Sequence, residues 1–177
     1  QYSGLTFSNT SSIINTTTQT ALYGNLGKYK ASGQPAFLAK NTTSPANVTG
    51  DGTLYTVEFD TEVFDQNSNF ASNTFTAPVT GKYQLSSSVI MSGITTAMTV
   101  GDISIVTTAN TFTSAIAPSK LFDGNTNCTF SINSLVPMTA GDTAVIKISF
   151  SNGAKVADVL GSGAGTLYTY FSGYLAC

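Results

Sequence analysis

The sequence contains no histidine, no arginine and no tryptophan among its 177 residues. Without histidine, no Ser-His-Asp or Cys-His catalytic arrangement can form, and the common histidine-ligated zinc site is excluded. Without arginine, there is no bidentate fork for a phosphate or a guanine base. The lysines are scattered and the formal net charge is −2, so no basic surface for nucleic acid is expected. We therefore predict a protein that is not an enzyme and does not bind nucleic acid.

Charge and long apolar runs are also scarce. Charged residues are 9% of the chain, against roughly 25% in an average soluble domain, so solubility depends on Ser, Thr, Asn and Gln. No apolar run approaches the ~18 residues of a membrane helix, and membrane insertion is not expected. Hydrophobic residues make up 41% of the sequence, enough for a core. The two cysteines, Cys128 and Cys177, leave open either one disulfide or two free thiols.

The first 33 residues differ in composition from the rest of the chain. They are rich in Ser, Thr and Asn, with short apolar spots between the polar residues. Two interpretations stay open for residues 1–33: a disordered linker or the end of a fibrous stalk built from several chains. Since the chain starts at Gln1, we expect it to be the C-terminal piece of a longer protein. Residues 34–177 are expected to form a single head domain.

From Pro35 onward, apolar and polar residues alternate with a period of two. Such runs have strand length and are bounded by Gly, Pro, Asn or Asp, whereas no stretch shows a convincing helical period. The clearest runs cover residues 55–63, 82–91, 129–134 and 143–150. The pattern predicts an all-β chain of about eight to ten short strands, arranged as a sandwich or a jelly roll.

The last predicted strand, TLYTYFSGYLAC, is apolar on both faces. One face carries leucine and phenylalanine, and the other carries Tyr168, Tyr170 and Tyr174. A strand on the outside of a monomeric sandwich normally has one polar face. The tyrosines either cover the sheet with their hydroxyls in water, or pack against other chains, because tyrosine is enriched at interfaces. The second interpretation predicts a closed symmetric oligomer.

Four segments resemble a known family in order and spacing. They are PAFLA from Pro35, the long run from Val57 to Val89 that contains TFTAPVTGKYQ, NSLVPMTAGDTAVIKIS from Asn133, and the terminal TYFSGYLAC. Together they resemble the globular head of complement C1q, within the tumour-necrosis-factor-like superfamily. The resemblance covers residues 35–177 and implies a ten-stranded jelly-roll β-sandwich that assembles as a homotrimer. It also implies that the first and last strands lie near the threefold axis, so the predicted interface residues are Phe37, Tyr168, Tyr170 and Tyr174.

The departures from the animal members suggest a location for this head. No Gly-X-Y repeat precedes it and its charge is very low, which resembles the C1q-like tips of bacteriophage tail fibres and virion spikes. We therefore predict a homotrimeric head at the C-terminal tip of a fibre on the virion surface. It would follow an upstream fibre shaft and bind a host cell-surface receptor or glycan. Two alternatives stay open: a structural module that trimerises and caps the fibre, and a secreted, extracellular adhesion protein.

Candidate ligand groups lie in two polar turns. Tyrosine and asparagine in loops are typical of carbohydrate recognition, because rings stack on sugars and amides bind hydroxyls. The candidates are Asp123, Asn125, Asn127 and Ser162, although plain polar turns would have the same composition.

Three acidic side chains form a second candidate site. Glu58, Asp60 and Glu62 alternate along one predicted strand face. They indicate either a solvated exterior or a calcium site. No other cofactor is expected.

Overall fold

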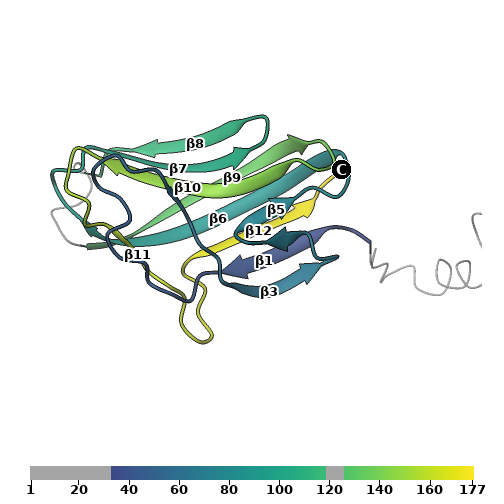
Figure 1. Cartoon of the computed structure of the whole chain (residues 1–177), viewed down its shortest axis with the longest axis horizontal. Coiled ribbons are helices and arrows are strands. Elements are labelled where there is room, and N and C mark those ends of the chain that lie inside the picture. The colour runs from purple at the N-terminus through teal and green to yellow at the C-terminus, as the bar shows by residue number, and fades with distance from the viewer. Residues whose placement is uncertain (1–32, 119–125) are drawn as a thin grey trace, which may run out of the picture. The chain divides into compact units, whose positions relative to one another are not determined.

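The computed structural model describes residues 33–118 and 126–177, which form one compact unit (Figure 1). The expected stalk or linker, apart from Gly33, lies outside the described residues. So do two of the predicted ligand residues, Asp123 and Asn125.

Twelve strands form two antiparallel sheets in the described part of the chain. In the first sheet, β12 lies between β1 and β6, β3 follows β1, and both β9 and β11 pair with β6. The strands of this sheet are β1 (Ala36–Lys40), β3 (Thr61–Gln66), β6 (Gly81–Ile94), β9 (Thr126–Met138), β11 (Asp158–Val159) and β12 (Tyr170–Leu175).

The second sheet has the order β4-β5-β10-β7-β8, and β2 also pairs with β10. Its strands are β2 (Tyr55–Thr56), β4 (Phe70–Ala71), β5 (Thr74–Thr76), β7 (Val100–Thr107), β8 (Thr111–Ile116) and β10 (Thr143–Ser151). The all-β prediction is confirmed. The twelve strands exceed the expected ten, and three of them, β2, β4 and β11, are two-residue segments.

Alternation explains why the long strands form and where the core lies. In β10, the fully buried residues are Ala144, Ile146, Ile148 and Phe150. The residues between them, such as Lys147, lie on the opposite face and stay partly exposed. Strand β6 repeats the pattern with buried Tyr83 and Leu85. Burying one face of each sheet against the other therefore forms the core between the two layers.

The predicted strand over residues 55–63 is wrong in one respect, because the chain changes sheets within it. β2 pairs with β10 in the second sheet, whereas β3 pairs with β1 in the first. Val57 and Phe59 enter the core during the crossing. After the crossing the alternation no longer marks a buried face, and Val63 is half-exposed. The carboxylates of Glu58, Asp60 and Glu62 consequently do not share one strand face.

Phe37 is a core residue and not an interface residue, which corrects the prediction made from the resemblance. Its side chain is 1% exposed. The ring stacks on Phe70 and Phe75 with centroids 5.0 and 4.7 Å away, and meets Phe171 edge-on at 4.9 Å. Phe37 lies opposite Gly173 in the β1–β12 pairing, and a Cβ at Gly173 would come within 2.8 Å of the Phe37 ring. The Phe37 side chain therefore packs entirely within one copy of the chain.

Candidate functional site

One candidate site is the face of the first sheet that points away from the core, here called the outer sheet face. Tyr174 on β12 is 50% exposed, and Phe64 on β3 and Leu135 on β9 are exposed to a similar extent. Tyr174 and Leu135 both lie opposite Gln84 of β6, on its two sides. Three strands therefore present large apolar side chains on the same surface.

Small polar residues fill the space between these large ones. Tyr170 lies opposite Ser88, Ser172 lies opposite Ser86, and Asn133 lies opposite Ser86 on its other side. This mixture of aromatic, aliphatic and hydroxyl groups with little charge suits contact with another protein surface. The tyrosine face expected from the sequence is thus present for Tyr174, which is exposed, and for Tyr170, which is partly buried.

Tyr168 has a different place from the other two tyrosines. Strand β12 begins only at Tyr170, so Tyr168 belongs to the preceding loop, where it is 48% exposed. The expected alternation over residues 166–175 therefore holds only from Tyr170 onward. Of the four predicted interface residues, the structure brings two together on the outer sheet face, buries Phe37 and puts Tyr168 on a loop.

The second candidate site is the end of the sandwich that carries the long loops. The described chain starts and ends at the other end, where the Leu175 N–H donates to Pro35 (3.1 Å) and Gln34 Nε2 donates to the Leu175 carbonyl (2.6 Å). The segments 41–54 and 152–169 lie at the opposite end (Figure 1). Backbone hydrogen bonds join these segments, among them those from Val48 to Ala157 (2.8 Å) and from Ala157 to Thr49 (3.0 Å). The loops therefore form an ordered surface.

Ser162, which the sequence suggested as a ligand group, is instead a structural residue. Its side chain is buried, and its Oγ accepts hydrogen bonds from the N–H groups of Tyr168 (2.9 Å) and Thr169 (3.1 Å). The same hydroxyl donates to the Thr169 carbonyl at 3.2 Å. This hydroxyl closes a loop and is not free for a ligand. Asn127 is exposed on β9, and it is the one predicted ligand residue that is both described and accessible.

Of the three carboxylates at residues 58, 60 and 62, that of Asp60 is held by nearby hydroxyl and backbone groups. Asp60 accepts hydrogen bonds from the Thr42 N–H (2.9 Å), the Thr42 hydroxyl (2.8 Å) and the Thr61 hydroxyl (3.0 Å). Burial opposes its ionisation, but these bonds outweigh burial, and the pKa of Asp60 lies below its ordinary value. No group of three or more His, Cys, Asp or Glu side chains within residues 33–118 and 126–177 is placed to hold a metal ion.

Tyr55 is the group with the largest change in acidity in this region. Burial raises the pKa of Tyr55 to about 12, and the Glu58 carboxylate contributes by opposing a second negative charge nearby. The phenol therefore stays protonated at any physiological pH.

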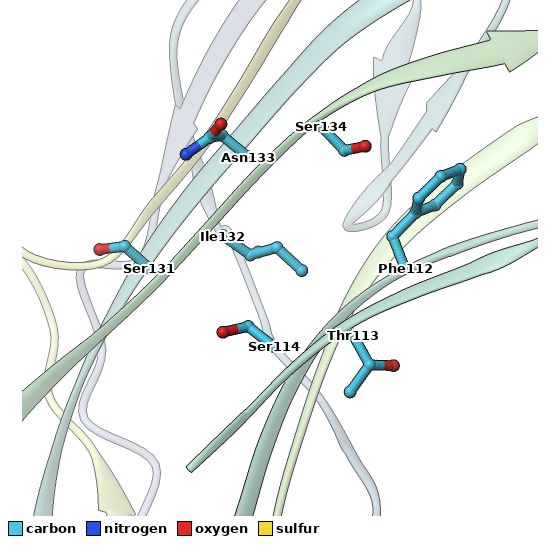
Figure 2. Close-up of a pocket in the computed structure, with 7 residues that line it drawn as sticks. All are labelled: Phe112, Thr113, Ser114, Ser131, Ile132, Asn133 and Ser134. Atoms are coloured by element: carbon cyan, nitrogen blue, oxygen red, sulfur yellow. The ribbon is translucent and has the colours of Figure 1, made fainter.

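A hollow of about 380 Å³ lies along the open side of the sandwich, between β8 and β9 (Figure 2). Phe112 and Ser114 line it from β8, and Ile132 and Ser134 line it from β9. The register places Ser114 opposite Ile103 and Ser134 opposite Leu85, which are both buried. Small serines at core-facing positions of two edge strands leave this space unfilled. Ser134, a small polar residue in the alternating run of β9, was the one sequence signal for this hollow.

The two cysteines are free thiols, so the disulfide alternative is not realised. Cys128 is buried in β9 and Cys177 is exposed at the end of the chain. Burial raises the pKa of the Cys128 thiol, which keeps it protonated and unreactive.

Comparison with protein-family models and with curated proteins gives no match. Among solved structures, the globular domain of zebrafish complement 1qA superposes with a TM-score of 0.54 and 15% identity, covering 81% of this chain and 98% of that chain. Murine APRIL superposes with a TM-score of 0.55 and 12% identity, covering 80% and 98%. The fold is therefore a C1q/TNF-like jelly roll, as the resemblance implied. Within the described ranges, no helix is long and apolar enough to cross a membrane.

Proposed function

We propose that this chain is a non-enzymatic, homotrimeric head at the tip of a virion fibre, which binds a receptor on the host cell surface. The observation that carries the proposal is the outer sheet face, where Phe64, Leu135, Tyr170 and Tyr174 gather on a surface with little charge. A monomer would leave these side chains in water. In a closed trimer, the outer sheet face of each subunit is buried against the other subunits. The C1q/TNF-like fold supports that choice of symmetry.

The positions of the chain ends support a recognition role for the loops. The described chain begins and ends at one end of the sandwich, so a shaft that precedes Gly33 would connect there. The segments 41–54 and 152–169 lie at the opposite end of the head (Figure 1), and under this proposal they would face the host cell. Three copies of a weak loop site engage one cell together, and the linkage multiplies their effect.

The assembly half of the proposal is tested by multi-angle light scattering on the full chain. We expect a mass of about three times the 18.4 kDa of one copy. Replacing Tyr170 and Tyr174 together by serine should lower the mass toward that of one copy. The matched control is Val79→Ser, since Val79 is also about half-exposed but lies in the turn before β6. A monomeric wild type, or a double variant that stays trimeric, contradicts the proposal.

The receptor half is tested with the isolated trimer and with fibres that lack it. We expect the labelled head to bind host cells and to compete with whole virions for them. The capping alternative rests on the same outer sheet face, since a trimer could also hold the shaft in register. A head that does not bind cells, combined with fibres that fail to assemble when it is deleted, favours the capping role.

A further inference from the structure

The loop between β11 and β12 projects beyond the sandwich, as the olive segment at the bottom of Figure 1 shows. Its base consists of buried residues, with Ser162 on one side and Thr169 on the other. Between them, residues 163–168 are all exposed. This loop therefore combines a fixed base with a fully accessible tip.

The base is held by a network of buried hydrogen bonds. The Asn41 N–H donates to the Thr169 carbonyl (3.0 Å), and the Ser162 N–H donates to the Asn41 carbonyl (2.7 Å). The Thr169 hydroxyl donates to the Leu160 carbonyl (2.7 Å) and accepts from the Ile90 N–H (3.2 Å). Asn41 and Thr169 are fully buried. Binding of a ligand at the tip therefore does not have to order the base of the loop.

The tip has the composition of a neutral recognition surface. Leu167 is 44% exposed and Tyr168 is 48% exposed, and residues 161–170 include no charged side chain. Gly165 has a φ of +75°, and a Cβ on Gly163 or Gly165 would meet nothing within 4 Å. A ligand can therefore approach the backbone N–H and C=O groups beside the Tyr168 ring.

We propose that the tip, residues 163–168, binds a neutral carbohydrate, with one sugar ring against Tyr168 and its hydroxyls bonded to Thr166 and the glycine backbone. This inference rests on the proposed receptor-binding function and names the chemistry of the receptor. Aromatic rings pack on apolar sugar faces, and neutral hydroxyl and amide groups exchange hydrogen bonds with sugar hydroxyls.

The size of the tip favours a sugar over a protein partner. A specific protein–protein interface takes about 20–30 residues from each side, whereas the tip offers only the six residues 163–168. Six residues suffice for one or two sugar rings at low affinity. A trimer presents the tip three times, which compensates for a weak single site on a cell surface.

The test uses the full-length trimer on an array of neutral and charged glycans, followed by titration with the best neutral glycan in solution. We expect Tyr168→Ala to weaken binding about tenfold per site, since one aromatic contact is lost, and Leu167→Ser to weaken it less. The matched control is Val79→Ser, because Val79 is 45% exposed and lies in the turn before β6, outside both loop segments. The control should bind as the wild type does.

The other outcomes separate this inference from the proposed function. If the wild type binds a neutral glycan and Tyr168→Ala binds it equally well, the loop assignment is wrong and the receptor role stands. If Tyr168→Ala is monomeric by light scattering, the loop belongs to the assembly and the inference is overturned. If the head binds host cells through a protein or a charged glycan, the assignment of a neutral carbohydrate is wrong and the receptor role stands. A wild type that binds neither glycans nor host cells overturns both proposals.

Discussion

Replacing Phe37 distinguishes a core residue from an interface residue. The phenylalanine lies between the stacked rings of Phe70 and Phe75, with Phe171 edge-on to it. Truncating a buried phenylalanine to alanine costs about 3–5 kcal/mol of unfolding free energy. Each aromatic pair adds about 0.5–1.5 kcal/mol beyond its buried area, so we expect Phe37→Ala to fall in the upper part of that range.

A loss of that size approaches the whole stability of an ordinary domain, about 5–15 kcal/mol, so a milder variant is needed beside it. Phe37→Leu keeps much of the volume and loses the ring contacts. We expect it to cost about 1–2 kcal/mol. The matched control is Tyr174→Leu on the neighbouring strand, because Tyr174 is half-exposed and points away from the core.

The assay is urea unfolding at two protein concentrations, combined with light scattering on the folded variants. Phe37→Leu should lower the midpoint at both concentrations while the folded mass stays that of the wild type. Tyr174→Leu should lower the folded mass and make the midpoint depend less on concentration than that of the wild type, since a dissociated subunit unfolds without linkage to assembly. If Phe37→Leu instead dissociates the protein without lowering the stability of the subunit, the core assignment is wrong.

Two further predictions concern the loops and the pH dependence. Ser162→Ala should lower the free energy of unfolding by about 1–3 kcal/mol, because the N–H groups of Tyr168 and Thr169 lose their acceptor. The measurement is hydrogen exchange at these two amides, which should become faster in this variant and stay unchanged in the exposed control Ser114→Ala. Unchanged exchange in Ser162→Ala would contradict the prediction. The folded pKa of Tyr55 is raised to about 12 from 10, so its contribution to stability is complete below pH 10 and is lost as the pH rises toward 12. Urea midpoints measured between pH 9 and 12 should therefore fall less for Tyr55→Phe than for the wild type, and parallel curves contradict the assignment.

The strands were predictable because burial in a sandwich imposes a period of two on the sequence. Ala144, Ile146 and Ile148 alternate and all enter the core, and turn residues such as Gly141 end the runs where expected. The run over residues 55–63 shows the limit of this signal. Alternation is local, whereas the sheet that a strand joins depends on distant partners, so a change from β10 to β1 as the neighbour leaves no mark in the pattern.

The site residues were less predictable for a related reason. Ser162 lies in a run of glycine, alanine and serine, and composition alone cannot show that one hydroxyl is buried among backbone groups while its neighbours are exposed. Phe37 was assigned from the position of its strand near a threefold axis. A strand has two faces, however, and only the burial of Phe37 among Phe70, Phe75 and Phe171 shows that this residue points inward.

Strand β12, together with Tyr168 and Thr169 before it, connects the core, the outer sheet face and the loop tip. Phe171 packs in the core, Tyr170 and Tyr174 lie on the outer sheet face, and Tyr168 ends the projecting loop. The Thr169 side chain, fully buried between Tyr168 and Tyr170, fixes the loop to the strand. A trimer formed through the outer sheet face would therefore also set the distances between the three loop tips. Since avidity depends on matching that spacing to the receptor, variants that loosen the outer sheet face should lose cell binding even where the affinity of a single tip for its ligand is unchanged.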